Sequence, residues 1–205
     1  MNCERKQFAI AGLLVTLLCV PVVGDVITRL DGDTAAAVSG SVAFSETGEW
    51  LADVEYAVYA PGAYPGDHSD SSTQWIYAYQ AFCDSGSTMT LASLSVGLLE
   101  GSGAASATDD STHGEPGGVA PLLSRLVGTP PTSVQWTIDV DAGEHTTVLL
   151  FSSPYSHTFD SATLANGGDG DTDLLPTPVP EPTTLSLLLL GGVVLARRIR
   201  KTGRA

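Results

Sequence analysis

Basic residues are scarce in the central part of this chain, and lysine is absent from it. Between Asp25 and Pro182 the cations are Arg29 and Arg125, against 22 acidic residues. So negative a surface opposes binding to nucleic acid and to anionic lipid, and it favours solubility. We therefore expect no nucleic-acid partner. The acids are interpreted as a solvated surface, with binding of divalent cations as the alternative.

Cysteine is almost as rare. The chain has Cys3, Cys19 and Cys83, and the first two lie in an N-terminal leader. Since one remaining cysteine cannot form an internal disulfide, the fold must be held by packing. Cys83 follows an apolar strand pattern, so we expect a buried and unreactive thiol.

Motifs of catalysis are also missing from the sequence. No Gly-x-Ser-x-Gly nucleophile elbow and no phosphate-binding glycine loop followed by lysine is present. The histidines fall in predicted loops without metal-ligand spacing to another histidine or cysteine; they are His68, His113, His145 and His157. We expect no enzyme, no catalytic residue and no cofactor.

The N-terminal residues 1–24 have the features of a secretory signal peptide. Arg5 and Lys6 precede an apolar run over 8–20, and Pro21 follows it. Small residues then lead to a predicted cleavage between Gly24 and Asp25. A leader that stays attached as an anchor is the alternative.

Residues 25–165 predict an all-β domain. Apolar and polar residues alternate with a period of two, and no amphipathic helix of ordinary length is present. We predict an antiparallel β-sandwich, Ig-like or jelly-roll-like. The expected strands cover residues 38–45, 50–60, 75–82, 92–98, 134–140 and 147–152, with a short edge strand at 159–164.

The connections of this domain follow from the same pattern. Residues 134–140 and 147–152 predict a hairpin. Apolar residues on both faces place 75–82 and 147–152 in sheet centres. Residues 100–118 predict a long exposed loop, and 120–127 a short helical turn.

The aromatic side chains allow two interpretations. Most share strand faces with Val, Ile and Leu, which predicts a core; the alternative is a sugar-stacking platform. The set is Trp50, Tyr56, Trp75, Tyr77, Tyr79 and Trp136. Tyr59 and Tyr64, beside a Pro-Gly loop, are the alternative surface candidates.

Residues 166–178 are rich in Gly, Asp, Thr and Pro and predict an acidic flexible linker. Asp169, Asp171 and Asp173 alternate like the first ligands of a Ca²⁺ loop. Leu174 stands where that loop needs glycine, and Pro180 where it needs glutamate. They are therefore weak metal candidates, and a solvated linker is the favoured interpretation.

The C-terminal residues 179–201 combine three elements. Val179, Pro180, Glu181 and Pro182 are followed by an uncharged apolar run over 183–196, and then by Arg197 and Arg198. An apolar run that ends in cations is typical of a segment that enters a membrane and stops. As a helix it would span about 20 Å, short of a bilayer core of about 30 Å. A permanent short anchor is the alternative to a transient one.

This arrangement resembles the PEP-CTERM sorting signal of Gram-negative bacteria. The resemblance is confined to residues 179–201, and it implies that an exosortase, a membrane protease, recognises Pro180, Glu181 and Pro182 while Arg197 and Arg198 form the stop. The chain would be the substrate, held transiently in the inner membrane and then released to the cell surface or outside. The implied role is structural or adhesive, among extracellular polysaccharides. The alternative is a secreted carbohydrate- or calcium-binding module.

Overall fold

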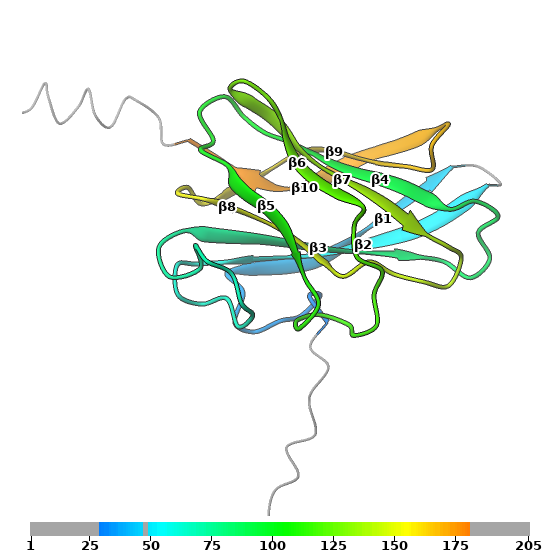
Figure 1. The fold of residues 1–205 in the computed structure, drawn as a ribbon, viewed down its shortest axis with the longest axis horizontal. Helices are drawn as coiled ribbons and strands as arrows, with labels where there is room; N and C mark the ends of the chain where they lie inside the picture. The colour runs from blue at the N-terminus through cyan, green and yellow to red at the C-terminus, as the bar shows by residue number, and fades with distance from the viewer. Residues whose placement is uncertain (1–28, 47–48, 181–205) are drawn as a thin grey trace, which may run out of the picture.

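Two antiparallel sheets of five strands each, packed face to face, make up the domain (Figure 1). The computed structural model describes residues 29–46 and 49–180. The strands are β1 (Val38–Glu46), β2 (Trp50–Tyr59), β3 (Trp75–Cys83), β4 (Leu91–Gly97), β5 (Ala105–Asp110), β6 (Leu123–Gly128), β7 (Pro131–Val140), β8 (Val148–Ser153), β9 (His157–Ala165) and β10 (Gly170–Pro178). The predicted β-sandwich is confirmed.

The main core lies between the sheets. The first sheet has the order β1-β2-β3-β8-β5, and the second β10-β9-β4-β7-β6. Tyr77 and Phe151 of the first sheet stack with ring centroids 4.7 Å apart. Trp136 of the second sheet is fully buried opposite them, and its Nε1 donates a hydrogen bond to the Thr108 carbonyl at 3.1 Å.

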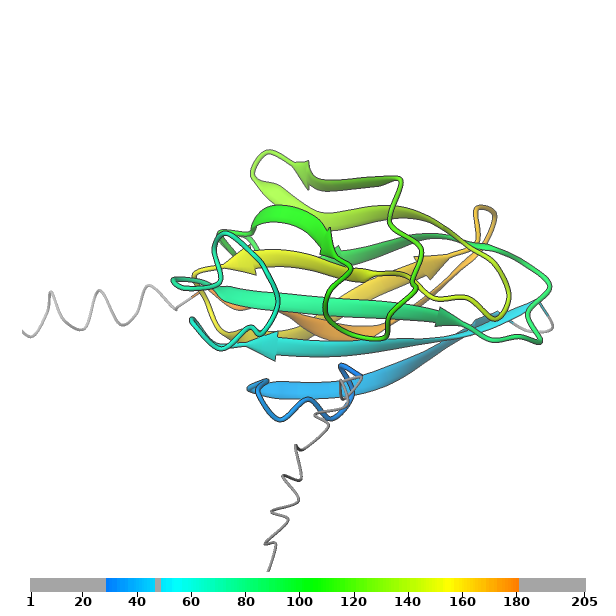
Figure 2. The same cartoon turned by 60° about the horizontal axis from the view of Figure 1, so that its bottom comes forward.

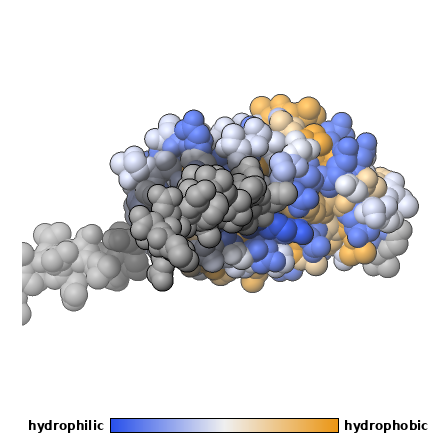
Figure 3. Space-filling model, turned by 90° about the horizontal axis from the view of Figure 1, so that it is seen from below, coloured by the Kyte–Doolittle hydropathy of each residue, from blue (hydrophilic) through white to orange (hydrophobic). Residues whose placement is uncertain are grey.

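A second apolar cluster covers the outer face of the first sheet, under the segments before β1 and between β2 and β3. It consists of Leu30, Ala57, Tyr59, Tyr64, Ile76, Ala78, Val148 and Leu150. Because β3 and β8 have a core on each face, their sequences are apolar on both faces. Their predicted central positions are confirmed. Seen from below Figure 1, the surface is a mixture of polar residues and separate apolar patches (Figure 3).

The predicted hairpin of residues 134–140 and 147–152 is wrong. Strand β7 pairs with β4 and β6 in the second sheet, whereas β8 pairs with β3 and β5 in the first. The connection between them therefore crosses from one sheet to the other. Alternation of apolar residues predicts that one face of a strand is buried. It does not show which sheet the strand joins, because both sheets of a sandwich bury one face in the core between them.

Three further predictions fail around the sheet margins. The expected loop 100–118 contains edge strand β5, and the expected helical turn 120–127 contains edge strand β6. Their neighbours β8 and β7 supply the backbone hydrogen bonds, so these strands form without an apolar pattern of their own. The predicted edge strand 159–164 belongs to β9, which lies inside its sheet between β10 and β4.

The predicted linker 166–178 is largely strand β10, which therefore belongs to the domain. It pairs with β9 from Gly170↔Ala165 to Pro178↔His157. Leu175 and Thr177 are fully buried. Proline is tolerated here because β10 is an edge strand. An edge strand has a hydrogen-bonded neighbour on one side only, so a residue without an N–H can face the open side.

The free edges of the two sheets lie near each other. Strand β1 adjoins β10, and β5 adjoins β6; Figure 2 shows the layered arrangement from a second direction. The backbone N–H of Ser45 donates to Asp171 Oδ2 across the first of these seams, at 2.9 Å.

In the part of the chain that the structure describes, no helix has the length and apolar character needed to cross a membrane. The predicted signal peptide (1–24) and the apolar run of the tail (183–196) fall outside the described residues.

Candidate functional site

Strand β10 carries the sorting element, and its last residues are held by hydrogen bonds from side chains and backbone. The hydroxyl of Tyr79 donates to the Pro176 carbonyl. Thr177 Oγ1 donates to the Gly97 carbonyl at 2.7 Å. The Val179 N–H donates to the Ser156 carbonyl at 2.9 Å, one residue beyond the strand. The fold thus holds the chain up to the first residue of the Val-Pro-Glu-Pro sequence.

Pro180 lies against the sandwich as well. It is half-buried, next to Gly101, which has a φ of +79°; a side chain there would approach the Pro180 ring to 3.8 Å. No free spacer therefore separates the domain from the sorting element. The remaining predicted positions of the element, Glu181, Pro182, Arg197 and Arg198, lie outside the described residues, as does the predicted cleavage at Gly24 and Asp25.

In a comparison with protein families, residues 178–201 match the PEP-CTERM protein-sorting motif. Residues 178–201 are a PEP-CTERM sorting motif. Its presence implies an exported, membrane-sorted protein that an exosortase processes. Neither a curated protein nor a solved structure matches the chain.

The PEP-CTERM motif leaves the sandwich at an end that carries fewer acids than the opposite end, and we call it the tail-side end. Residues 98–103, 128–132 and 154–156 form part of it, and the β2–β3 connection, residues 60–74, lies at the same end. Hydrogen bonds join these segments to one another and to the sheets: Leu98 N–H to Thr132 O, Ser153 Oγ to Ser102 O and Tyr77 hydroxyl to Tyr155 O. Glu100 is the one charged residue in residues 98–103, 128–132 and 154–156, and the β2–β3 connection adds Asp67 and Asp70.

The opposite end, which we call the far end, is strongly acidic. It is formed by the β1–β2, β3–β4, β7–β8 and β9–β10 connections, to the right in Figure 1. Its acids are Glu46, Glu49, Asp84, Asp141, Glu144, Asp169 and Asp171. The sequence shows these acids but not that the topology brings them to one end.

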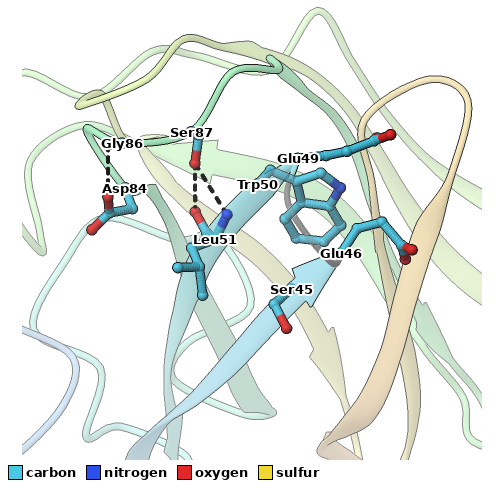
Figure 4. A pocket seen from close by; sticks show the side chains of 8 residues that line it. All are labelled: Ser45, Glu46, Glu49, Trp50, Leu51, Asp84, Gly86 and Ser87. Carbon is cyan, nitrogen blue, oxygen red and sulfur yellow. Dashed lines mark hydrogen bonds between the residues drawn. The ribbon is translucent and has the colours of Figure 1, made fainter.

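A pocket of about 410 Å³ opens at this far end (Figure 4). Trp50 lines it and is 2% exposed, and its Nε1 has no hydrogen-bond partner among the described residues. In Figure 4 the indole nitrogen lies on the side toward which Glu46 and Glu49 extend. The pocket therefore combines an unused N–H donor with carboxylate acceptors.

Other aromatic residues fill the core. Tyr77, Tyr79 and Trp136 are fully buried, whereas Tyr56 and Trp75 are half-buried. The prediction that most of the set is core is confirmed. Tyr59 and Tyr64 are buried as well, at 0% and 7% exposure, so their assignment to the surface is wrong. The loop between β2 and β3 folds back over them instead of projecting outward.

The hydroxyls of these two tyrosines enter a buried polar network. Tyr59 donates to Asp33 Oδ2 at 2.6 Å and lies 2.9 Å from His113 Nε2. Tyr64 donates to Asp110 Oδ2 at 2.7 Å. Burial, together with these carboxylate partners, raises the pKa of both phenols far above their usual value. The network fastens the covering loops to the first sheet.

Asp110 itself receives further hydrogen bonds. Burial alone would raise the pKa of its carboxyl, but the Thr112 hydroxyl and N–H and the Tyr64 hydroxyl donate to it and lower that pKa overall. Asp70 has a lowered pKa for a related reason, since the Ser106 and Ser152 hydroxyls donate to it.

The neighbourhood of Ser106 has the residue types of a nucleophilic site without the geometry. Ser106 has a φ of 54°, and its hydroxyl donates to Asp70 Oδ2 at 2.6 Å. His68 Nε2 lies 3.4 Å from the Ser106 carbonyl oxygen. The imidazole thus contacts the carbonyl, whereas a general base must accept the hydroxyl proton.

The weak calcium candidates are extended rather than gathered in a loop. Asp171 and Asp173 lie in β10, and Asp173 Oδ1 accepts from the Leu174 N–H at 2.6 Å. Asp169 precedes the strand, and its N–H donates to Asn166 Oδ1. Among residues 29–46 and 49–180 no group of three His, Cys, Asp or Glu side chains is placed to hold a metal ion.

The single cysteine of the domain is buried, as expected. Cys83 is 4% exposed, and burial raises the pKa of its thiol, an effect that a hydrogen bond from Ser87 partly offsets.

Proposed function

We propose that this protein is the substrate of an exosortase-type membrane protease, not an enzyme, and that its sandwich serves a structural or adhesive role among extracellular polysaccharides. The observation that supports the proposal is the PEP-CTERM motif joined directly to one end of a folded domain whose other end is acidic and carries a pocket. A tail fixed at one end leaves the other end free for contacts away from the membrane.

The chemistry of the far end suits a polyhydroxylated ligand. Sugar hydroxyls both donate and accept hydrogen bonds, so they can pair with Glu46 and Glu49 as acceptors and with the Trp50 N–H as a donor. A fully buried N–H without a partner costs about 1–3 kcal/mol, which a ligand oxygen would recover. This pairing needs a small outward movement of the indole edge or of the carboxylates beside it.

Sorting is tested in cells with Pro180→Ala and Glu181→Ala. Both variants should remain in the inner membrane with the tail attached, because the protease loses the element that it recognises. Pro154→Ala, an exposed proline of the tail-side end, is the matched control and should be released normally. Release of the motif variants at the rate of the unaltered protein would contradict sorting through this element.

The second candidate function is a carbohydrate-binding module, which the Trp50 pocket favours. Trp50→Phe keeps most of the ring volume and removes the N–H. In a glycan array this variant should lose binding, while Trp75→Phe, at the tail-side end of β3, should keep it. If both variants bound glycans equally well, the Trp50 pocket would not be the glycan-binding site.

The calcium-binding alternative is tested by calorimetry. We propose that no specific Ca²⁺ site is present, since Asp171 and Asp173 are extended along β10 and a Ca²⁺ loop has to fold its ligands around the ion. Titration of the full chain with Ca²⁺ should therefore give no saturable heat. A saturable signal that disappears in Asp171→Asn would restore the alternative.

A further inference from the structure

We propose that the tail-side end is a docking surface for the headgroups of an anionic phospholipid bilayer, pressed against them while the tail is still in the membrane. This inference rests on the proposed function, because it requires the apolar run to be inserted. It adds a surface and an orientation that the sorting motif does not specify.

The first argument is the length of the tether. The fold holds the chain through Val179, and Pro180 lies beside Gly101. The apolar run begins at Thr183, so three residue steps, about 10 Å when extended, separate Pro180 from it. The headgroup layer on each side of a bilayer is about 6 Å thick. The tail-side end therefore lies within a few ångströms of the headgroups, too close for a layer of free solvent.

The second argument is charge. The tail-side end carries three acids, Glu100, Asp67 and Asp70, of which Glu100 and Asp67 are exposed. Asp70 is turned toward the Ser106 and Ser152 hydroxyls. The acids of the far end are separated from the membrane by the length of β10, whose nine residues span about 30 Å. That is about three Debye lengths at 0.1 M salt, so repulsion from anionic lipid is largely screened in this orientation.

The third argument is the chemistry of the surface itself. Leu99 is 36% exposed, Tyr155 is half-buried and Pro154 is exposed. Tyrosine, with an apolar ring and a polar hydroxyl, suits the headgroup layer. An inverted domain would bring seven acids to an anionic surface, whereas this orientation brings three, Glu100, Asp67 and Asp70.

The test uses the full chain with Cys3→Ser and Cys19→Ser, made in a host without exosortase so that the tail remains. A polarity-sensitive fluorophore is attached to Leu99→Cys in one protein and to Leu51→Cys in the other. Leu51 is the matched control, because it is an exposed leucine (56%) at the far end. Vesicles of phosphatidylethanolamine and phosphatidylglycerol carry a spin label on their headgroups.

We expect strong quenching of the fluorophore at position 99 and none at position 51. A flexible Gly/Ser spacer of about 20 residues between Pro180 and Glu181, spanning about 25 Å, should abolish most of the quenching at 99. Equal quenching at both positions, or quenching that the spacer leaves unchanged, would overturn the proposal. Flotation of the chain with the vesicles separates the two claims. A chain that floats without quenching at 99 refutes the docking surface alone, and a chain that does not float refutes the membrane stage of sorting as well.

Discussion

At the scale of single residues, the carboxyl of Asp110 makes the stability of the folded state depend on pH. It is 6% exposed and is bonded to Thr112 and to the Tyr64 hydroxyl. Its pKa in the folded protein is lowered, below a value of about 3.9 in the unfolded chain. A lowered carboxyl pKa stabilises the folded state above the unfolded pKa, and this contribution is lost as the pH falls through the folded pKa.

The free energy of unfolding should therefore fall as the pH drops below about 4. In Asp110→Asn it should be lower at neutral pH and should decrease less steeply toward acid. Chemical denaturation over a pH series measures both quantities. Asp139→Asn, which removes an exposed carboxylate of β7, is the control. An acid slope in Asp110→Asn identical to that of the unaltered protein would contradict this account.

Cys83 gives a second test at this scale. Because its thiol is buried and its pKa is raised, little reactive thiolate is present near neutral pH. A thiol reagent added to the exported protein should label Cys83 very slowly in buffer and completely in denaturant. Rapid labelling of the folded protein would mean that the end of β3 opens readily.

At the scale of elements, β10 decides where the domain ends. Leu175 is fully buried whereas Leu174 beside it is 53% exposed. Leu175→Ala should lower the free energy of unfolding by about 2–4 kcal/mol, because a buried leucine loses its contacts. Leu174→Ala, the matched control, should change it by less than about 0.5 kcal/mol. If both substitutions changed the free energy of unfolding by small and equal amounts, residues 170–178 would be a linker and not part of the folded domain.

The strands that the sequence predicts well are those with an apolar pattern of their own. The alternation in β2 and β7 has a physical cause, since one face of each strand is buried between the sheets. Strands β5 and β10 are polar or proline-containing, and a neighbouring strand stabilises them. Their own residues show no apolar pattern from which pairing with a neighbouring strand could be predicted. The sequence therefore predicted a loop for β5 and a linker for β10. For the same reason the sequence could not show that β7 and β8 lie in different sheets.

At the scale of the whole molecule, the sandwich has a charge polarity along its long direction. The PEP-CTERM motif was predictable from adjacent residues, because its parts follow one another in the chain. The polarity was not, since Glu46, Asp84, Asp141 and Asp169 come from four separate connections that the topology places at one end. The Trp50 pocket was missed for the same reason, although Glu46 and Glu49, between the predicted strands 38–45 and 50–60, were a visible signal.

The central claim is that the folded sandwich, including β10, is exported and then released by cleavage of the tail. The cleavage falls just after Val179 and Pro180, the last residues that contact the fold. Mass spectrometry of the intact exported protein tests this most directly. We predict a chain that begins at Asp25, retains β10 and ends near Pro182. A chain that still carries residues 197–205, or one that ends before Gly170, would contradict the claim.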